Sequence, residues 1–268
     1  MQRQLILNAD DFGWDKDAST GILKLVDAGK ICNVSVMANH VEEEDLLRLR
    51  QYHSSISTGL HITLNAGYPL SYKRKNSLID DHTGKFHTSQ ELFHKALRQK
   101  INYTDVLDEL KAQRKRLLDS GIRITHADSH QHIHQYPVLG RLILQALKDL
   151  GIKKVRNCAP LNIYDERRMI LSAFCLLTRR KLNMFQHPDV LITDFTNKHF
   201  DFSSQPVSLF DIIAKSKYQV VEWMCHPALQ NREDSYLQRK QEFDFLKTFD
   251  WNALLSTHNF KMEQYKNL

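Results

Sequence analysis

Short apolar runs alternate with amphipathic stretches along most of the 268-residue chain. The apolar runs are typical of buried strands, which we expect at Leu5–Asn8, Asn33–Ala38, Ser57–Leu64, Ile122–Asp128, Lys154–Arg156, Val190–Thr193, Gln219–Cys225 and His258–Phe260. Apolar residues three and four positions apart predict helices between most of them, from Asp17 to Gly29 and over Val41–Tyr52, Thr104–Ser120, Val138–Leu150, Ile163–Lys181, Val207–Ser216 and Glu233–Phe249. Asp17 and Thr104 are of the residue types that cap helices.

Alternation of strands and helices predicts a parallel sheet with helices outside it, either closed as a barrel or open and doubly wound. Seven or eight candidate strands favour a barrel. A barrel of this length forms one domain, so we expect a single domain over residues 1–268. The segment Ala66–Gln90 interrupts the alternation, and we expect it to be a lid over a site or an oligomer contact.

The composition is that of a soluble globular protein, with 42% hydrophobic and 25% charged residues. The net charge is +6, but the basic residues lie on predicted helix faces and belong to no nucleic-acid-binding motif. We therefore expect no nucleic acid partner. The four cysteines form no close pair and indicate free thiols in a reducing compartment. No apolar run is long enough for a membrane span or a signal peptide. These features together predict a cytoplasmic protein.

Polar side chains that suit metal binding follow several predicted strands. Asp10 and Asp11 come directly after the first strand, where a cation would relieve their mutual repulsion and leave one carboxylate available as a base. His61 lies on the polar face of an alternating strand and is expected to point into the barrel. Either feature alone is also compatible with an ordinary turn or a hydrogen-bonded core histidine.

The strongest signal is the run THADSHQHIH, in which four histidines and an aspartate occupy every second position from His126 to His134. Imidazole and carboxylate groups are preferred ligands of zinc and related divalent metals. The spacing does not say whether the ligand is His130 or one of His126, His132 and His134. His226 follows a further predicted strand and Arg156 ends another, and a parallel barrel brings such strand ends together at one edge.

The motifs NADDFG, GLH, THADSHQHIH and MCHP, in this order, resemble the YdjC/ChbG family of carbohydrate deacetylases. The resemblance covers nearly the whole chain and implies a deformed (β/α) barrel related to polysaccharide deacetylases. It also implies one divalent metal ion, magnesium or zinc. By motif it implies metal ligands and catalytic residues as follows: Asp11, His61 and His130 bind the metal, Asp10 is the base, His226 is the general acid and Arg156 orients Asp10. The chain departs from the family pattern at Gln131 and Ala228.

The expected function is metal-dependent hydrolysis of N-acetyl groups on N-acetylglucosamine-containing sugars such as chitooligosaccharides, with release of acetate. Trp14, Tyr68, Phe86 and Trp223 are candidate platforms for a sugar ring or residues of the core. Alternatives are a metal-dependent phosphoesterase or amidohydrolase acting on another small substrate, and a sugar-binding homologue without turnover. The N-acetylated amino sugar is the expected partner, and a homodimer is a possible assembly.

Overall fold

The computed structural model describes residues 2–71 and 76–268. Its strands are β1 (Arg3–Phe12), β2 (Asn33–Val36), β3 (Ser57–Ile62), β4 (Ile124–Ser129), β5 (Val190–Ile192), β6 (Val220–Cys225) and β7 (Phe260–Met262). Its α-helices are α1 (Lys16–Asp27), α2 (Glu43–Arg50), α3 (Ser89–Leu97), α4 (Tyr103–Asp119), α5 (Leu139–Asp149), α6 (Glu166–Leu182), α7 (Gln205–Lys215), α8 (Arg239–Thr248) and α9 (Trp251–Thr257). Short 3₁₀ segments lie at His130–Gln135, Asp194–Thr196 and Tyr265–Asn267.

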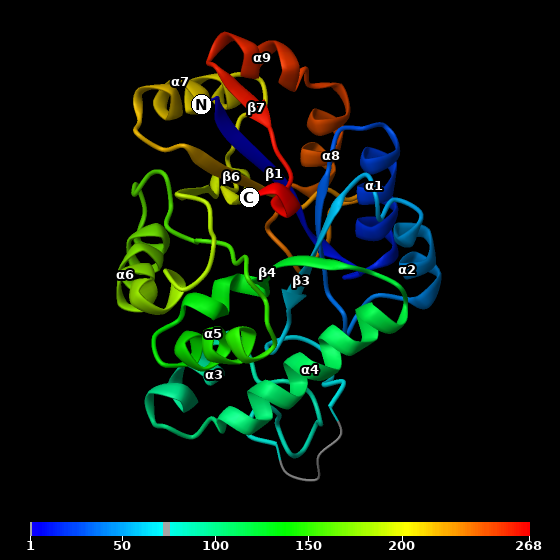
Figure 1. The fold of residues 1–268 in the computed structure, drawn as a ribbon, viewed down its shortest axis with the longest axis vertical. Helices are drawn as coiled ribbons and strands as arrows, with labels where there is room; N and C mark the ends of the chain where they lie inside the picture. The colour runs from blue at the N-terminus through cyan, green and yellow to red at the C-terminus, as the bar shows by residue number, and fades with distance from the viewer. Residues whose placement is uncertain (1, 72–75) are drawn as a thin grey trace.

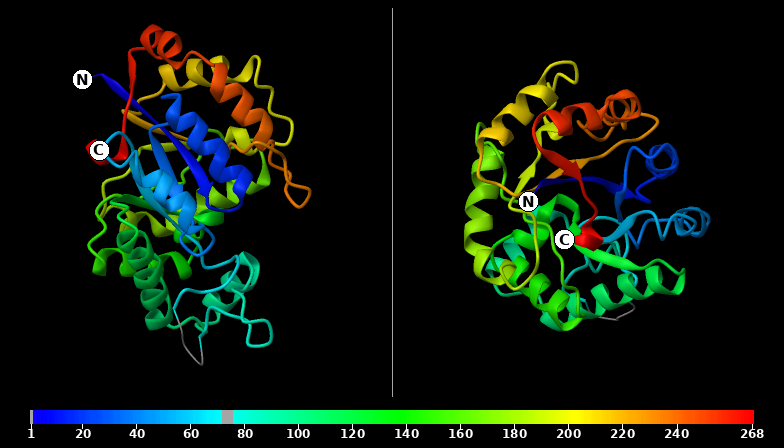
Figure 2. Two further views of the ribbon diagram at one scale, coloured as in Figure 1. Left: turned by 90° about the vertical axis from the view of Figure 1, so that its right-hand side faces the viewer. Right: turned by 45° about the horizontal axis from the view of Figure 1, so that its top comes forward.

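The strands form one curled parallel sheet in the order β4-β3-β2-β1-β6-β5. β7 pairs with the beginning of β1, next to the place where β2 pairs with its end. The helices lie around the outside of the sheet (Figures 1 and 2). Isolated parallel bridges continue from β4 toward β5 through Val155, Lys154 and Pro160. The structure therefore confirms the predicted barrel-like parallel fold, closed only in part by regular strands.

The predicted strand Lys154–Arg156 is wrong as a regular strand. Backbone hydrogen bonds from these residues alternate between two neighbours: Arg156 N donates to Ala127 O at 3.0 Å, and Val155 N donates to Gln186 O at 3.0 Å. The chain pairs with each of these two backbone segments over only a few residues. It then reaches Pro160, which has no N–H group to donate to a ladder. The result is a set of bridges that links β4 toward β5 without a ladder of its own.

Several helix boundaries differ from the prediction because the capping geometry differs. Asp15, not Asp17, caps α1, with its side chain accepting from Ala18 N at 2.8 Å. Thr104 lies inside α4, which begins after Asn102 without a side-chain capping bond. The helix predicted over Glu233–Phe249 begins only at Arg239. The short helices α3 and α9 were not predicted, since their apolar patterns span too few turns.

The described residues of Ala66–Gln90 pack against α4 by way of buried acids. Leu70 N and Ser71 N donate to the carboxylate of Glu109 at 3.1 and 2.8 Å, and Ser77 donates to Asp105. Residues 72–75 lie outside the described residues. The segment's function as a lid or subunit contact stays a prediction.

Residues 260–267 comprise β7 and the turn after it, and they join distant parts of the chain. Glu263 N donates to Leu5 O at 2.8 Å, and Tyr265 N donates to Asn33 Oδ1 at 2.8 Å. The Tyr265 ring stacks on His126 with centroids 3.8 Å apart, and its hydroxyl donates to Glu222. This segment therefore links β1, β2 and β6, and the Tyr265 side chain is completely buried.

Gly59 in β3 is required by the close approach of the His126 ring. A Cβ atom at this position would lie 2.4 Å from His126 Nε2 and 2.6 Å from its Cε1. The His126 ring also stacks on Tyr265, so a side chain at position 59 would disturb a second buried contact. We expect Gly59→Ala to lower the free energy of unfolding by about 1–3 kcal/mol, measured by urea denaturation. A loss below about 0.5 kcal/mol would show that the ring can shift.

Candidate active site

Asp10 and Asp11 stand near the end of β1 and point to different partners. Both side chains are buried, and Asp11 has a left-handed backbone conformation with φ 63°. This conformation interrupts the regular alternation of the strand, and the pairing register of β1 with β2 shifts in the same place. The two adjacent carboxylates can therefore serve separate functions.

Asp11 lies between the two histidines that the sequence predicts as metal ligands. Its Oδ1 is 3.3 Å from His61 Nε2 and 3.1 Å from His130 Nδ1. His61 comes from β3, and His130 opens the 3₁₀ segment that follows β4. Donor atoms from the ends of β1, β3 and β4 thus converge at the carboxyl edge of the parallel sheet, the edge where such folds place their sites.

The spacing of these three donor atoms fits a divalent metal. Two ligands at tetrahedral angles around zinc are about 3.3 Å apart, and two adjacent ligands in an octahedral magnesium site are about 3.0 Å apart. The separations of 3.3 and 3.1 Å from Asp11 Oδ1 agree with both geometries. The donor set of two imidazoles and one carboxylate suits zinc and leaves further coordination positions open. The residues therefore fit the implied metal but do not select its identity.

Asp128 orients His61 from behind. Its Oδ1 is 2.8 Å from His61 Nδ1, and its Oδ2 accepts a hydrogen bond from Ser35 at 2.7 Å. Burial alone would lower the pKa of His61, but the carboxylates of Asp128 and Asp11 raise it, so a metal ion would have to displace the proton on Nε2. A carboxylate on one imidazole nitrogen leaves the other directed at the metal, which is the usual support for a metal-binding histidine.

Arg156 binds three carboxylates in the fully buried interior. Its Nη1 and Nη2 contact Asp10 Oδ2 and Oδ1 at 2.6 and 2.7 Å. Nη2 also lies 2.9 Å from Asp128, and Nε donates to Glu222 at 2.8 Å. Burial opposes the charge of Arg156, but these three carboxylates hold its pKa well above the usual value. Arg156 therefore fixes the plane of Asp10, which is the contact that the sequence-based hypothesis requires.

His226 follows β6 and faces Asp10. Its Nε2 is 3.9 Å from Asp10 Oδ2, while Nδ1 is buried without a hydrogen-bond partner among the described residues. The backbone N–H of His226 donates to Glu242 of α8, which fixes the chain as it leaves the strand. Burial lowers the pKa of His226 to about 4, so its ring is neutral at neutral pH.

Arg239, the first residue of α8, was not among the predicted site residues. Its Nη2 contacts Asp11 Oδ2 at 2.6 Å, on the opposite side of the carboxylate from the histidines. Burial alone would raise the pKa of Asp11, but Arg239 and His130 hold it well below the usual value. Arg239 follows an irregular loop and no strand, so neither motif spacing nor the sheet pattern indicated it.

The histidine-rich run is divided by the 3₁₀ segment. Gln131 and His132 have φ values of 54° and 59°, which turn their side chains away from the direction of the strand. His126 and His134 point into the interior, where His134 lies 2.6 Å from Ser129 Oγ and 3.0 Å from Arg156 O. Of this run, His130 and His132 line the site cavity of about 240 Å³.

The buried neutral histidines should make the fold sensitive to acid. Burial lowers the pKa of His126 to about 3 and that of His134 to about 4. The unfolded chain takes up these protons below about pH 6.5 and the folded chain does not, so stability is complete above that pH and falls as the pH drops toward 4. We expect His126→Gln to reduce this slope by up to about 1.4 kcal/mol per pH unit, measured by urea denaturation between pH 4.5 and 7.5. The exposed His199→Gln is the control, and equal slopes in all three proteins would contradict the assignment.

Trp14 is the aromatic residue next to the candidate metal ligands. Its ring lies 4.7 Å from that of His130, and the guanidinium of Arg232 lies 5.0 Å from its centroid. Trp223, by contrast, is fully buried in the aromatic core with Phe195 and Trp251, and Phe86 is also buried. Among the described residues that line the site cavity, Trp14 is therefore the candidate sugar platform from the sequence analysis.

The fold and the site define an α/β protein whose histidines and aspartates meet at the carboxyl edge of a curled parallel sheet. The YdjC-like protein family model matches residues 4–257, so the chain belongs to that family. A carbohydrate deacetylase of Geobacillus stearothermophilus is 31% identical over 85% of this chain and 80% of its own length. A carbohydrate deacetylase of Vibrio parahaemolyticus is 27% identical over 99% of this chain and 96% of its own length.

The same fold occurs in a crystal structure from Enterococcus faecalis V583, described as that of a proposed cellobiose-phosphate cleavage protein. The structural alignment covers 100% of this chain and 99% of the chain in that crystal structure, with a TM-score of 0.80 and 23% sequence identity. Among the described residues, no helix is both long and apolar enough to cross a membrane.

Proposed function

We propose that the protein hydrolyses the N-acetyl group of an amino sugar, with one divalent metal ion held by Asp11, His61 and His130. The observation that carries the proposal is the position of Asp11 Oδ1 between His61 Nε2 and His130 Nδ1, beside the Asp10–His226 pair. Membership in a family whose relatives include carbohydrate deacetylases supports the same reaction. Hydrolysis breaks the amide C–N bond and yields acetate and a free amine.

The bound ion would supply Lewis acidity for the acetamide carbonyl and for a water molecule. Asp10 accepts the proton of the attacking water, and its Oδ2 is the oxygen closest to His226. Arg156 and Asn8 donate to the Asp10 carboxylate at 2.6–2.7 Å, which holds it in one orientation while it acts. Arg239 holds Asp11 Oδ2 and thereby keeps Asp11 Oδ1 toward the two histidines.

His226 protonates the departing nitrogen. Burial keeps its ring neutral at neutral pH, so the proton that it delivers must come from the reaction itself. The attacking water gives that proton to Asp10. Because Asp10 Oδ2 and His226 Nε2 are 3.9 Å apart, Asp10 can then pass the proton to His226. The water proton therefore ends on the amine, and both side chains return to their starting states.

An N-acetylated sugar suits the surroundings of these groups. Trp14 lines the cavity together with Arg232 and Arg239, and a pyranose could pack on its ring once the Arg232 guanidinium, 5.0 Å from the ring centroid, moves aside. The relatives named as carbohydrate deacetylases point to the same substrate class. We propose an N-acetylglucosamine-containing sugar, such as a chitooligosaccharide, as the substrate.

The geometry favours one metal over the two metals that many phosphoesterases use. Asp10, His61 and Asp128 form a second group of potential ligands, but Arg156 already binds both carboxylates. A second cation there would have to displace the guanidinium from a fully buried position. The alternative of a two-metal phosphoesterase therefore has less support.

Acetate release from di-N-acetylchitobiose tests the proposal. We expect metal-loaded protein to release acetate, and we expect a chelator or His130→Ala to abolish the release, because His130 supplies one of three ligand atoms. Metal binding is measured in parallel by calorimetry. Metal binding at one site per chain without acetate release would disprove the substrate class, and release that survives the chelator would disprove the metal.

A further inference from the structure

One wall of the candidate active-site cavity is a surface loop between β6 and α8. The tip of this loop, residues 232–237, supplies five of the residues that line the cavity: Arg232, Asp234, Ser235, Tyr236 and Leu237. The volume of the cavity is about 240 Å³, whereas pockets that bind small molecules usually measure about 300–1,000 Å³. The space for a sugar beside Asp11 and His130 therefore depends on where the loop tip lies.

Both ends of the loop are fixed to the body of the protein. Ala228 N donates to Arg239 O at 3.1 Å and closes the loop at its base. Asn231 Oδ1 accepts from a backbone N–H in the first turn of α8 at 2.9 Å, and Gln238 Nε2 donates to a carbonyl of the segment after β5 at 3.3 Å. Surface loops with ends this close form compact units. The loop tip can therefore move between fixed ends while Arg239 stays on Asp11.

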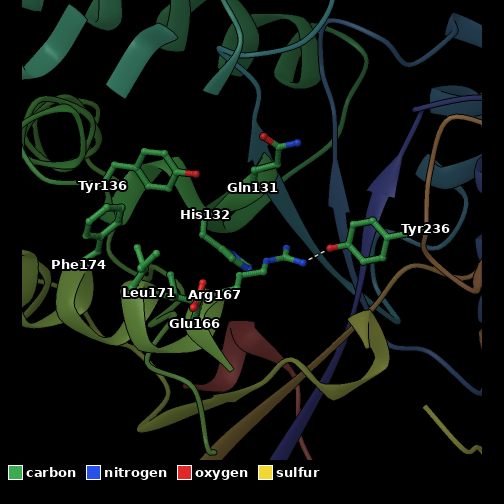
Figure 3. Close-up of a pocket in the computed structure, with 9 residues that line it drawn as sticks. Gln131, His132, Tyr136, Glu166, Arg167, Leu171, Phe174 and Tyr236 are labelled. Atoms are coloured by element: carbon green, nitrogen blue, oxygen red, sulfur yellow. Dashed lines mark hydrogen bonds between the residues drawn. The ribbon is translucent and has the colours of Figure 1, made fainter. Parts of the chain in front are cut away.

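Two side chains of the loop tip hold it against two different helices. Arg232 Nη1 contacts Asp15 Oδ2 at 2.5 Å, at the beginning of α1, and its guanidinium lies over the Trp14 ring, 5.0 Å from the centroid. Arg167 of α6 donates to the hydroxyl of Tyr236, and Figure 3 shows this contact. All six residues of the loop tip are half-buried or exposed, so no buried side chain anchors it.

These contacts are of kinds that add little stability. The Arg232 side chain is 25% exposed and that of Asp15 is 32% exposed, and ion pairs and cation–π contacts between partly exposed groups are weak. Segments held by few contacts open more readily than the rest of a fold. Opening of the loop tip also removes Arg232 from the Trp14 ring and frees that side of the ring for a pyranose.

We propose that residues 232–237 form a lid over the candidate metal ligands, held closed by Arg232 and Tyr236, and that release of these two contacts admits the sugar to Trp14. The sugar as the ligand rests on the proposed function, whereas the movement of the lid does not. In the closed position Arg232 covers Trp14. In the open position the ring is free, and the bound sugar takes the place of the guanidinium.

The fluorescence of Trp14 tests the lid directly. Trp14 is half-buried, while Trp223 and Trp251 are 0% and 5% exposed, so acrylamide quenches mainly Trp14, and Trp14→Phe gives the background. We expect Arg232→Gln and Tyr236→Ala each to raise the quenching constant of Trp14 about two- to fivefold, because either substitution favours the open lid. Tyr236 contacts α6, so its effect on Trp14 has to pass through the lid.

Exposed positions of α6 supply the controls. Arg180→Gln matches the change of charge, and Leu176→Ala matches the truncation of a large side chain; neither residue lines the site cavity. We expect both controls to be quenched like the wild type. A rise in Arg232→Gln without one in Tyr236→Ala would show that the loop tip is a fixed wall and would overturn the lid. No rise in either variant, or an equal rise in the controls, would overturn it as well. Thermal melts verify that each variant folds.

Di-N-acetylchitobiose separates the lid from the proposed function. With chelator-treated wild-type protein, we expect the disaccharide to reduce quenching, because the sugar takes the place of Arg232 on Trp14. Raised quenching in both lid variants, without acetate release by the metal-loaded protein, would support the lid and disprove the deacetylation. Acetate release together with unchanged quenching in both lid variants would support the deacetylation and overturn the lid.

Discussion

Replacing Arg156 by methionine is expected to lower the free energy of unfolding by about 3–5 kcal/mol, the largest loss of stability that we predict for a single site. The substitution keeps most of the apolar stem but removes the cation that neutralises Asp10, Asp128 and Glu222 in the fully buried interior. Without this cation, the three buried carboxylates would either take up protons in the folded protein or favour the unfolded state, in which water solvates them. Urea denaturation in the presence of a chelator measures the loss without a contribution from metal binding.

Two further variants test the physical reason. Arg156→Lys keeps one positive charge but cannot contact both oxygens of Asp10 as Nη1 and Nη2 do, so we expect an intermediate loss. Arg123→Met, at an exposed position just before β4, should change stability by less than about 0.5 kcal/mol. A loss below about 1 kcal/mol in Arg156→Met would mean that water or structural rearrangement replaces the guanidinium.

Asp10→Asn is expected to lower kcat for acetate release by about 10²–10⁴-fold, while metal affinity remains within a few-fold of the wild type. The amide keeps the shape of the carboxylate but cannot accept the proton of the attacking water. Asp11→Asn, one residue away, should instead abolish metal binding, because its Oδ1 faces both histidines. Calorimetry with zinc and with magnesium, combined with acetate measurements, separates the two effects.

This matched pair of variants tests whether Asp10 acts as the base and Asp11 as the metal ligand. Both residues are buried within β1, so differences in exposure do not explain different outcomes. Asp10→Asn that retains more than a tenth of the wild-type kcat would remove Asp10 as the base. Loss of metal binding in both variants would instead show that Asp10 is itself a ligand.

The strand pattern predicted that the Asp10–Asp11 pair, His61 and the histidine-rich run meet at one edge, because parallel strands carry their carboxyl ends to the same edge. The family resemblance then selected Asp11 and His130 among these residues. It also indicated Arg156, although the residues around it form bridges and not the predicted strand. Asp128 was visible in principle, since it lies opposite His61 in the pairing of β3 with β4. To predict this contact one must know the pairing register of β3 and β4, and a single sequence does not reveal that register.

Other parts of the site depend on long-range packing and irregular backbone. The left-handed conformations of Gln131 and His132 divide the histidine-rich run. Glycine is the residue type that predicts such a conformation from sequence, and neither residue is a glycine. Arg239 reaches Asp11 from a helix that begins 228 positions later in the chain. Local patterns do not encode a contact of that kind, because it exists only once the helix has packed on the sheet.

The hydrogen bond between Tyr265 and Asn33 joins residues 232 positions apart, and β7 pairs with the beginning of β1. The ribosome synthesises β1 long before β7. Until β7 arrives, the first residues of β1 present unpaired backbone groups to solvent, and Glu222 lacks the Tyr265 hydroxyl. Unpaired strand edges promote aggregation, and distant contacts slow folding. The first residues of β1 therefore remain an open strand edge, with which other chains can pair, until β7 has been synthesised.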